Sequence, residues 1–118
     1  MLLLAALTVF TLGACLGLYM AGRVLRGRFA PWRVSLTHAL LGATGLGLLV
    51  AASLTHGSAT RQILLPFSLF LITALGGFFL ASFHLRQRIA PKFVVAVHVT
   101  IGLMAFAALV DLMRAALF

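Results

Sequence analysis

The sequence predicts an all-α integral membrane protein: a four-transmembrane-helix bundle made of two parallel two-helix repeats. Three observations lead to this prediction. Of the 118 residues, 64% are hydrophobic and only 8% are charged, whereas soluble domains carry about 25% charged residues. Four uncharged stretches are each close to the length of a membrane-spanning helix. The first half of the chain also aligns with the second half at an offset of sixty residues.

The uncharged stretches cover residues 1–22, 34–60, 62–85 and 93–110, counting histidine as neutral. A helix needs about 20 mostly apolar residues to cross the hydrocarbon core. The stretches are continuous rather than alternating, which favours helices over the strands of a β-barrel. We therefore expect one membrane domain, residues 1–118, with repeat 1 at about 1–56 and repeat 2 at about 62–116. The expected helices are at about 2–22, 32–55, 62–85 and 92–115.

Most basic residues fall in two loops, one after the first expected helix and one after the third. The net charge is +8 and Asp111 is the single acidic residue. By the positive-inside rule both basic loops are cytoplasmic and both termini are outside, in a bacterial inner membrane. Nucleic-acid binding is not expected, because these charges separate apolar runs instead of forming one stripe. The loop residues are Arg23, Arg26, Arg28, Arg33, Arg86, Arg88 and Lys92.

The single cysteine restricts the redox chemistry that the chain can carry. Cys15 ends a stretch, Leu12 to Cys15, that has the form of a lipoprotein cleavage box. A signal peptide carries positive charge before its apolar core, and here Arg23 follows it. We therefore expect an uncleaved helix in which Cys15 is a small apolar residue. One cysteine makes no internal disulfide, and the absence of a CxxCH motif excludes covalently attached c-type haem.

The repeat is strongest around the basic loops. Between Leu7 and Val50, 14 of 44 positions are identical to the residue sixty positions later. Two helices separate the copies, so the copies run in the same direction about a pseudo-twofold axis along the membrane normal. Small residues spaced by four in the first and third helices favour close helix contact. The matches include Leu25-Arg26-x-Arg28-x-Ala30-Pro31 with Leu85-Arg86-x-Arg88-x-Ala90-Pro91.

The repeat also pairs two histidines, His38 and His98, each seven residues after a helix-start proline. That spacing places them about 10 Å below the cytoplasmic interface. An ionisable side chain at such a depth suggests function, and two imidazoles facing each other across the axis would supply two ligands to one metal. Gly42 and Gly102, four residues later on the same helix faces, would leave space for a flat macrocycle. Candidates to hydrogen-bond the second ring nitrogens are Ser35, Thr37 and Thr100.

This arrangement resembles the small membrane b-type cytochromes, which hold haem b between the helices of a four-helix bundle through paired histidines. The resemblance covers His38-x-x-x-Gly42, His98-x-x-x-Gly102 and the four-helix layout. It implies an electron-transfer protein with one haem b near the cytoplasmic face, and a quinone, reductase or partner subunit as redox partner. The iron ligands would be His38 and His98. Residues placed to pair with the haem propionates are Arg26, Arg28, Arg86 and Arg88.

The sequence contains only one matched histidine pair. His56 aligns with Ala116, and His84 aligns with Val24. A second function class also stays open: a cofactor-free accessory subunit of a membrane complex, or a small transporter, in which the histidines only hydrogen-bond to neighbouring helices. No nucleotide loop or nucleophile constellation is visible, so the sequence does not decide whether the protein is an enzyme. A homo-oligomer and a larger complex are both compatible with the sequence.

Overall fold

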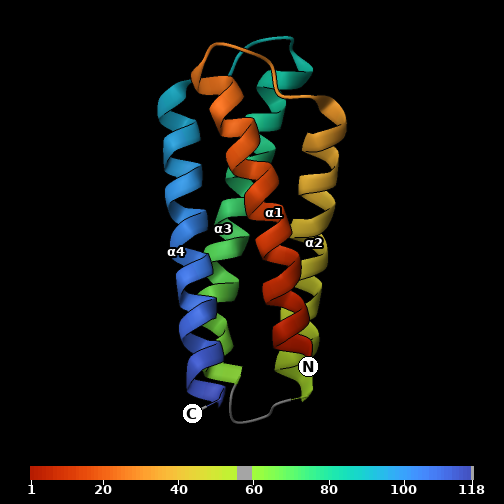
Figure 1. The fold of residues 1–118 in the computed structure, drawn as a ribbon, viewed down its shortest axis with the longest axis vertical. Helices are drawn as coiled ribbons and strands as arrows, with labels where there is room; N and C mark the ends of the chain where they lie inside the picture. The colour runs from red at the N-terminus through yellow and green to blue at the C-terminus, as the bar shows by residue number, and fades with distance from the viewer. Residues whose placement is uncertain (56–59, 118) are drawn as a thin grey trace.

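The computed structural model describes residues 1–55 and 60–117, without the side chains of residues 60, 61 and 117. Its helices form an up-down-up-down bundle with extents of 45 × 20 × 18 Å. Both termini lie at one end, and the α1–α2 and α3–α4 connections lie at the other end, here called the loop end (Figure 1). The helices are α1 (Leu2–Leu25), α2 (Trp32–Thr55), α3 (Thr60–Leu85) and α4 (Lys92–Leu117).

The predicted all-helical four-helix fold is confirmed. Each helix is long and apolar enough to span a membrane, with a mean hydropathy between 1.7 and 2.4 over its span. No more than 17% of any span is buried inside the chain, so most apolar side chains point outward. A surface of this kind is typical of helices whose surroundings are lipid or a partner protein.

The two turns at the loop end share one backbone geometry. At the end of α1, the N–H of Arg28 donates to the carbonyl of Arg23 at 3.0 Å, and the N–H of Gly27 donates to Val24 at 2.9 Å. This is the Schellman motif, which requires a left-handed residue just after the helix. Gly27 supplies it with φ 70°. Because this cap lies after Leu25, α1 ends three residues beyond the expected range of 2–22.

The second turn repeats this motif sixty residues later. The N–H of Arg88 donates to Phe83 at 2.9 Å, and the N–H of Gln87 donates to His84 at 3.0 Å. Gln87 therefore takes the place of Gly27 and has φ 53°, a conformation that costs a non-glycine residue about 1–2 kcal/mol. Both turns place the following proline next to a new helix start, where a missing N–H leaves no hydrogen bond unmade.

The packing divides the bundle into two halves along its length. Helix α1 contacts α2 and α4, and α3 contacts the same two helices, so α1 and α3 occupy one diagonal and α2 and α4 the other. The contiguous buried apolar cluster lies in the half nearer the termini, while Ala21 and Val95 are buried separately toward the loop end. The members of the cluster are Ala6, Phe10, Leu49, Ala52, Ile63, Phe70, Ala105, Leu109 and Leu112.

Candidate functional site: the paired histidines

The rings of His38 and His98 meet across the α2–α4 diagonal. Their centroids are 6.4 Å apart, and the ring planes are inclined at 67°. Both residues are half-buried and lie in the half of the bundle toward the loop end, beyond the apolar core. The helices α2 and α4 do not pack against each other, yet these two half-buried rings from them lie close together.

His38 is held by α1. Its Nδ1 lies 2.8 Å from the carbonyl oxygen of Gly13. A carbonyl only accepts, so Nδ1 donates to it, and in the neutral form of the ring Nε2 is the nitrogen that keeps its lone pair. The ring also lies directly on Gly17, where an added Cβ would be 2.9 Å from Cε1. Glycine at this position is what allows the imidazole to lie between α1 and α2.

His98 is held differently, although α3 also offers it glycines. An added Cβ on Gly77 would lie 3.3 Å from Cε1 of His98, and one on Gly76 would lie 3.4 Å from Nδ1. The Nδ1 atom is buried and has no hydrogen-bond partner in the described part of the chain. The backbone of Thr73 approaches the ring without meeting hydrogen-bond geometry at that atom.

The two glycines expected to make space behave differently. Around Gly42 an added Cβ would meet nothing within 4 Å, so the space beside it is open. At Gly102 an added Cβ would lie 3.3 Å from the methyl group of Thr73. The space at Gly102 is therefore occupied by a side chain from α3.

The hydroxyl groups near the histidines are engaged elsewhere. Ser35 donates to the sulfur of Met20 at 3.2 Å and to the carbonyl of Pro31 at 3.3 Å. Thr37 donates to the carbonyl of Arg33 at 2.9 Å, and Thr100 is exposed. The partner of His38 is instead a backbone carbonyl, which residue type cannot reveal. The sequence feature that could have pointed to this carbonyl is the pair Gly13 and Gly17, because the backbone of a glycine is not covered by a side chain and a neighbouring ring can reach it.

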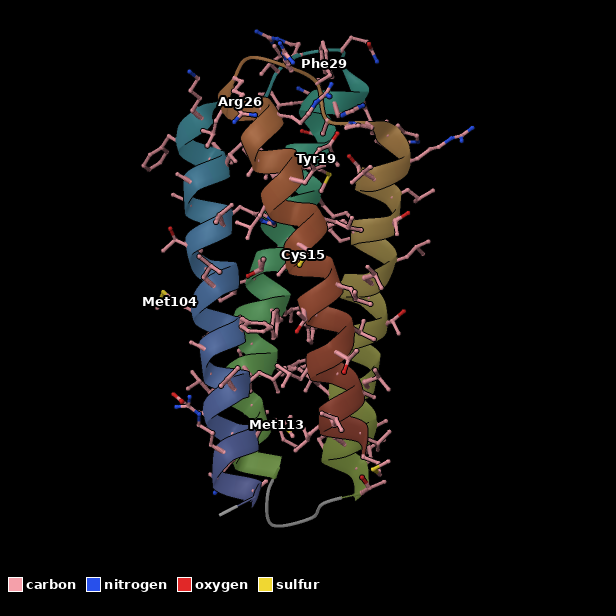
Figure 2. The ribbon with its side chains drawn as sticks, in the orientation of Figure 1. Cys15, Tyr19, Arg26, Phe29, Met104 and Met113 are labelled. Carbon is pink, nitrogen blue, oxygen red and sulfur yellow. The ribbon has the colours of Figure 1, made fainter. Side chains whose placement is uncertain are left out.

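The basic residues lie at the loop end, on the same side of the apolar core as the histidines. The four arginines Arg26, Arg28, Arg86 and Arg88 are exposed, and Figure 2 shows Arg26 beside the turn with Phe29 near it. Arg23 is used locally, since its Nε donates to the carbonyl of Phe29 at 3.1 Å. The arginines thus form a cationic rim above the histidine pair.

The other histidines do not join the pair. His84 packs at the loop end against Trp32 and Phe29, with centroid separations of 5.0 and 5.9 Å. His56 lies outside the described residues. The structure therefore brings together His38 and His98 and keeps His84 in a separate aromatic cluster.

The two imidazoles can be compared with the ligand requirements of a bare metal ion and of haem. No group of three or more His, Cys, Asp or Glu side chains gathers in the described residues, so a bare ion that needs several protein ligands is poorly served there. Haem supplies four equatorial nitrogens itself and needs only two axial ligands. A metal–nitrogen bond of about 2 Å on each side implies ring centroids about 6 Å apart. The observed separation of 6.4 Å is close to this value.

Two cavities of the described part of the chain lie away from the histidines. An open groove of about 370 Å³ between α3 and α4 is lined by Gln62, Pro66 and Asp111 among others. A smaller cavity of about 90 Å³ lies between α2 and α3, beside Leu49 and Ile63. Both belong to the half near the termini, so the only carboxylate of the chain is remote from the paired imidazoles.

Comparison with known proteins adds no assignment. No family model matches the chain, and no curated protein or solved structure shows significant similarity to it. The functional argument therefore rests on the residues and their geometry.

Proposed function

We propose that the protein is a membrane electron carrier that binds one haem b between α2 and α4, with His38 and His98 as the two axial ligands. The single observation that carries the proposal is the separation of the two rings, 6.4 Å between centroids. Two imidazoles at this separation match the requirement of one iron held from opposite sides. Haem bound there would supply a one-electron iron couple.

The hydrogen bond of His38 supports the assignment. A histidine that ligates a metal through Nε2 commonly donates its Nδ1–H to a carbonyl or carboxylate, which fixes the tautomer and the ring orientation. Gly13 provides that acceptor at 2.8 Å. His38 thus already has the tautomer in which Nε2 is free to bind a metal.

The distribution of packing also favours a ligand in the loop-end half. The contiguous buried core stops short of the histidines, and the space beside Gly42 is open. A macrocycle would supply the apolar contacts that side chains supply in the other half. Of the two glycines that follow the histidines, only Gly42 leaves room for the macrocycle, because the methyl group of Thr73 occupies the space at Gly102.

The remaining parts of the proposal concern the membrane. The two halves of the chain are parallel repeats, and the cationic loop end faces the cytoplasm. The exposed arginines at that end would pair with the haem propionates by charge-assisted hydrogen bonds. One haem near one face leaves most of a hydrocarbon core of about 30 Å uncrossed. The protein would therefore exchange electrons with a quinone, a reductase or a partner subunit rather than carry them across the membrane alone.

The proposal is tested by the absorption spectrum of the protein, purified in detergent from cells supplied with a haem precursor. We expect a Soret band and, after reduction with dithionite, the resolved alpha and beta bands of a low-spin haem with two histidine ligands. A pyridine haemochrome assay should report one haem b for each chain. Each of the variants His38→Ala and His98→Ala should lose the haem or become high-spin.

The matched control is His84→Ala, which removes a histidine from the aromatic cluster outside the pair and should keep the low-spin spectrum. A colourless wild-type preparation would overturn the haem assignment and leave the cofactor-free accessory subunit or transporter. Unchanged low-spin spectra in both His38→Ala and His98→Ala would show that the ligands are wrongly assigned.

A further inference from the structure

The two histidines differ in one respect that the sixty-residue alignment does not predict. Nδ1 of His38 has a carbonyl acceptor, Gly13, at 2.8 Å. Nδ1 of His98 is buried with no hydrogen-bond partner among the described residues. The residue that aligns with Gly13 is Thr73, and its backbone is the one that approaches His98. The same backbone position therefore faces each ring, but only at His38 does the contact meet full hydrogen-bond geometry, while the backbone of Thr73 makes a weaker hydrogen-bonding contact with His98.

The side chain of Thr73 is a local difference between the two sites. Its hydroxyl donates to the carbonyl of Leu69, one turn earlier on the same helix, at 2.8 Å. This bond directs the methyl group toward α4, where it lies 3.3 Å from the Cβ position of Gly102. Gly13 has no side chain, and its own Cβ position is 3.7 Å from the nearest atom, Cβ of Leu41. The methyl group of Thr73 thus lies between α3 and α4 beside Gly102, and Gly13 offers no corresponding group between α1 and α2.

We propose that Thr73 is a positioning residue that makes the two imidazoles inequivalent, so that His38 is a fixed ligand and His98 an exchangeable one. Its methyl group acts as a spacer that keeps the Thr73 carbonyl out of full hydrogen-bond geometry with His98. Without an acceptor in that geometry, the ring of His98 has no fixed tautomer and no bond that holds its orientation. A buried ring nitrogen without a hydrogen-bond partner also lowers the stability of this orientation, and rotation of the ring toward a new partner would remove that penalty.

The second half of this inference rests on the proposed haem function. A ligand that lacks an outer hydrogen bond is held less firmly and is a poorer electron donor to iron. His98 is therefore the ligand that a small neutral molecule of the carbon monoxide class displaces from the reduced protein, while His38 stays bound.

The first half is tested without haem. Protein labelled with ¹⁵N-histidine is purified in detergent free of haem and observed by NMR at a pH of about 8, above the ordinary histidine pKa of about 6.5. His38→Ala and His98→Ala assign the two pairs of ring nitrogen signals. His38 should show a protonated Nδ1 and an unprotonated Nε2, whereas His98 should show signals averaged between the two tautomers. Identical patterns for the two rings in the wild-type protein would overturn the assignment.

Two variants separate the spacer from other effects. Thr73→Gly removes the methyl group and should shift the His98 signals to the pattern of His38. Thr73→Val keeps the volume and a methyl group toward Gly102 but removes the hydroxyl, and it should leave His98 as in the wild-type protein. If Thr73→Val changes His98 as much as Thr73→Gly does, the spacer role is wrong.

The second half is tested on the haem-loaded, dithionite-reduced protein by titration with carbon monoxide. The wild-type protein and Thr73→Val should bind it with a shifted Soret band. Thr73→Gly should bind it about fivefold more weakly, the effect of one added hydrogen bond. No binding by the wild-type protein, or equal binding by all three, would overturn the exchangeable role. If the rings differ by NMR but the protein takes up no haem, the proposed function fails, the exchange role fails with it, and the role of Thr73 stands.

Discussion

The ring of Phe10 on α1 stacks face to face on the ring of Phe70 on α3, with centroids 3.6 Å apart and planes within 2° of parallel. The two residues are sixty positions apart, as His38 and His98 are. The phenylalanines close the α1–α3 diagonal, whereas the histidines meet across the α2–α4 diagonal. Seven residues of helix separate the two layers on α2, from His38 to Gly45, or about 10 Å. A dry aromatic layer thus lies beneath the histidine pair.

The stacked phenylalanines should be only weakly coupled. Aromatic pairs prefer offset or edge-on geometries, and a direct face-to-face stack gains little beyond its buried area. We expect a double-mutant cycle of Phe10→Leu and Phe70→Leu to give a coupling energy of about 0.5 kcal/mol, at the low end for aromatic pairs. Each free energy of unfolding is measured in detergent micelles titrated with a denaturing detergent. A coupling energy well above 1.5 kcal/mol would show that the stack is a main stabilising contact.

Gly45 is the position on which Phe10 depends most directly. An added Cβ there would lie 2.5 Å from the Phe10 ring, which is packed against Phe70 and has little freedom to move. Gly45→Ala should therefore lower the free energy of unfolding by about 1–3 kcal/mol through overpacking. Gly47→Ala is the control on the same helix, since an added Cβ there meets nothing within 4 Å. Equal effects of the two substitutions would refute the steric explanation.

Gly17 should control the geometry of the His38 ligand. An added Cβ would lie 2.9 Å from the His38 ring, so Gly17→Ala should turn the imidazole and weaken its bond to Gly13. In the haem-loaded protein we expect a partly high-spin spectrum and haem lost more readily to apomyoglobin. Gly22→Ala, at a position on α1 with nothing within 4 Å, should retain the low-spin spectrum. An unaltered spectrum in Gly17→Ala would remove Gly17 from the site.

Gln87 adopts a left-handed backbone conformation that is unfavourable for a non-glycine residue and that glycine adopts without this penalty. Its φ of 53° occurs in the same turn geometry as Gly27 with φ 70°. Gln87→Gly should raise the free energy of unfolding by about 1 kcal/mol, and Gly27→Ala should lower it by a similar amount. Thermal unfolding in detergent, followed by circular dichroism, measures both. A destabilised Gln87→Gly would mean that the Gln87 side chain contributes more than its backbone conformation costs.

The sequence predicted most of the helical organisation, but less of the site. The apolar runs and the paired Arg and Pro residues indicated the four helices and the two turns, because both signals are local. The end of α1 at Leu25 was missed, since charge at Arg23 was taken as the boundary and the cap forms only after Leu25. His38 and His98 were selected by their repeated register, and the structure places their rings 6.4 Å apart.

What the sequence by itself determined is which residues are in helices and which residues correspond across the sixty-residue offset. The tertiary structure alone decided which helix each histidine faces and what lies against it. Gly42 and Gly102 share a helix with the histidines, yet the glycines that accommodate the rings are Gly17 and Gly77 on neighbouring helices. The physical reason is that periodicity defines a helix face but not its rotation against a neighbour. The matched positions Gly13 and Thr73 face the two rings with different side chains, which the sixty-residue alignment shows but whose place against the histidines only the packing decides.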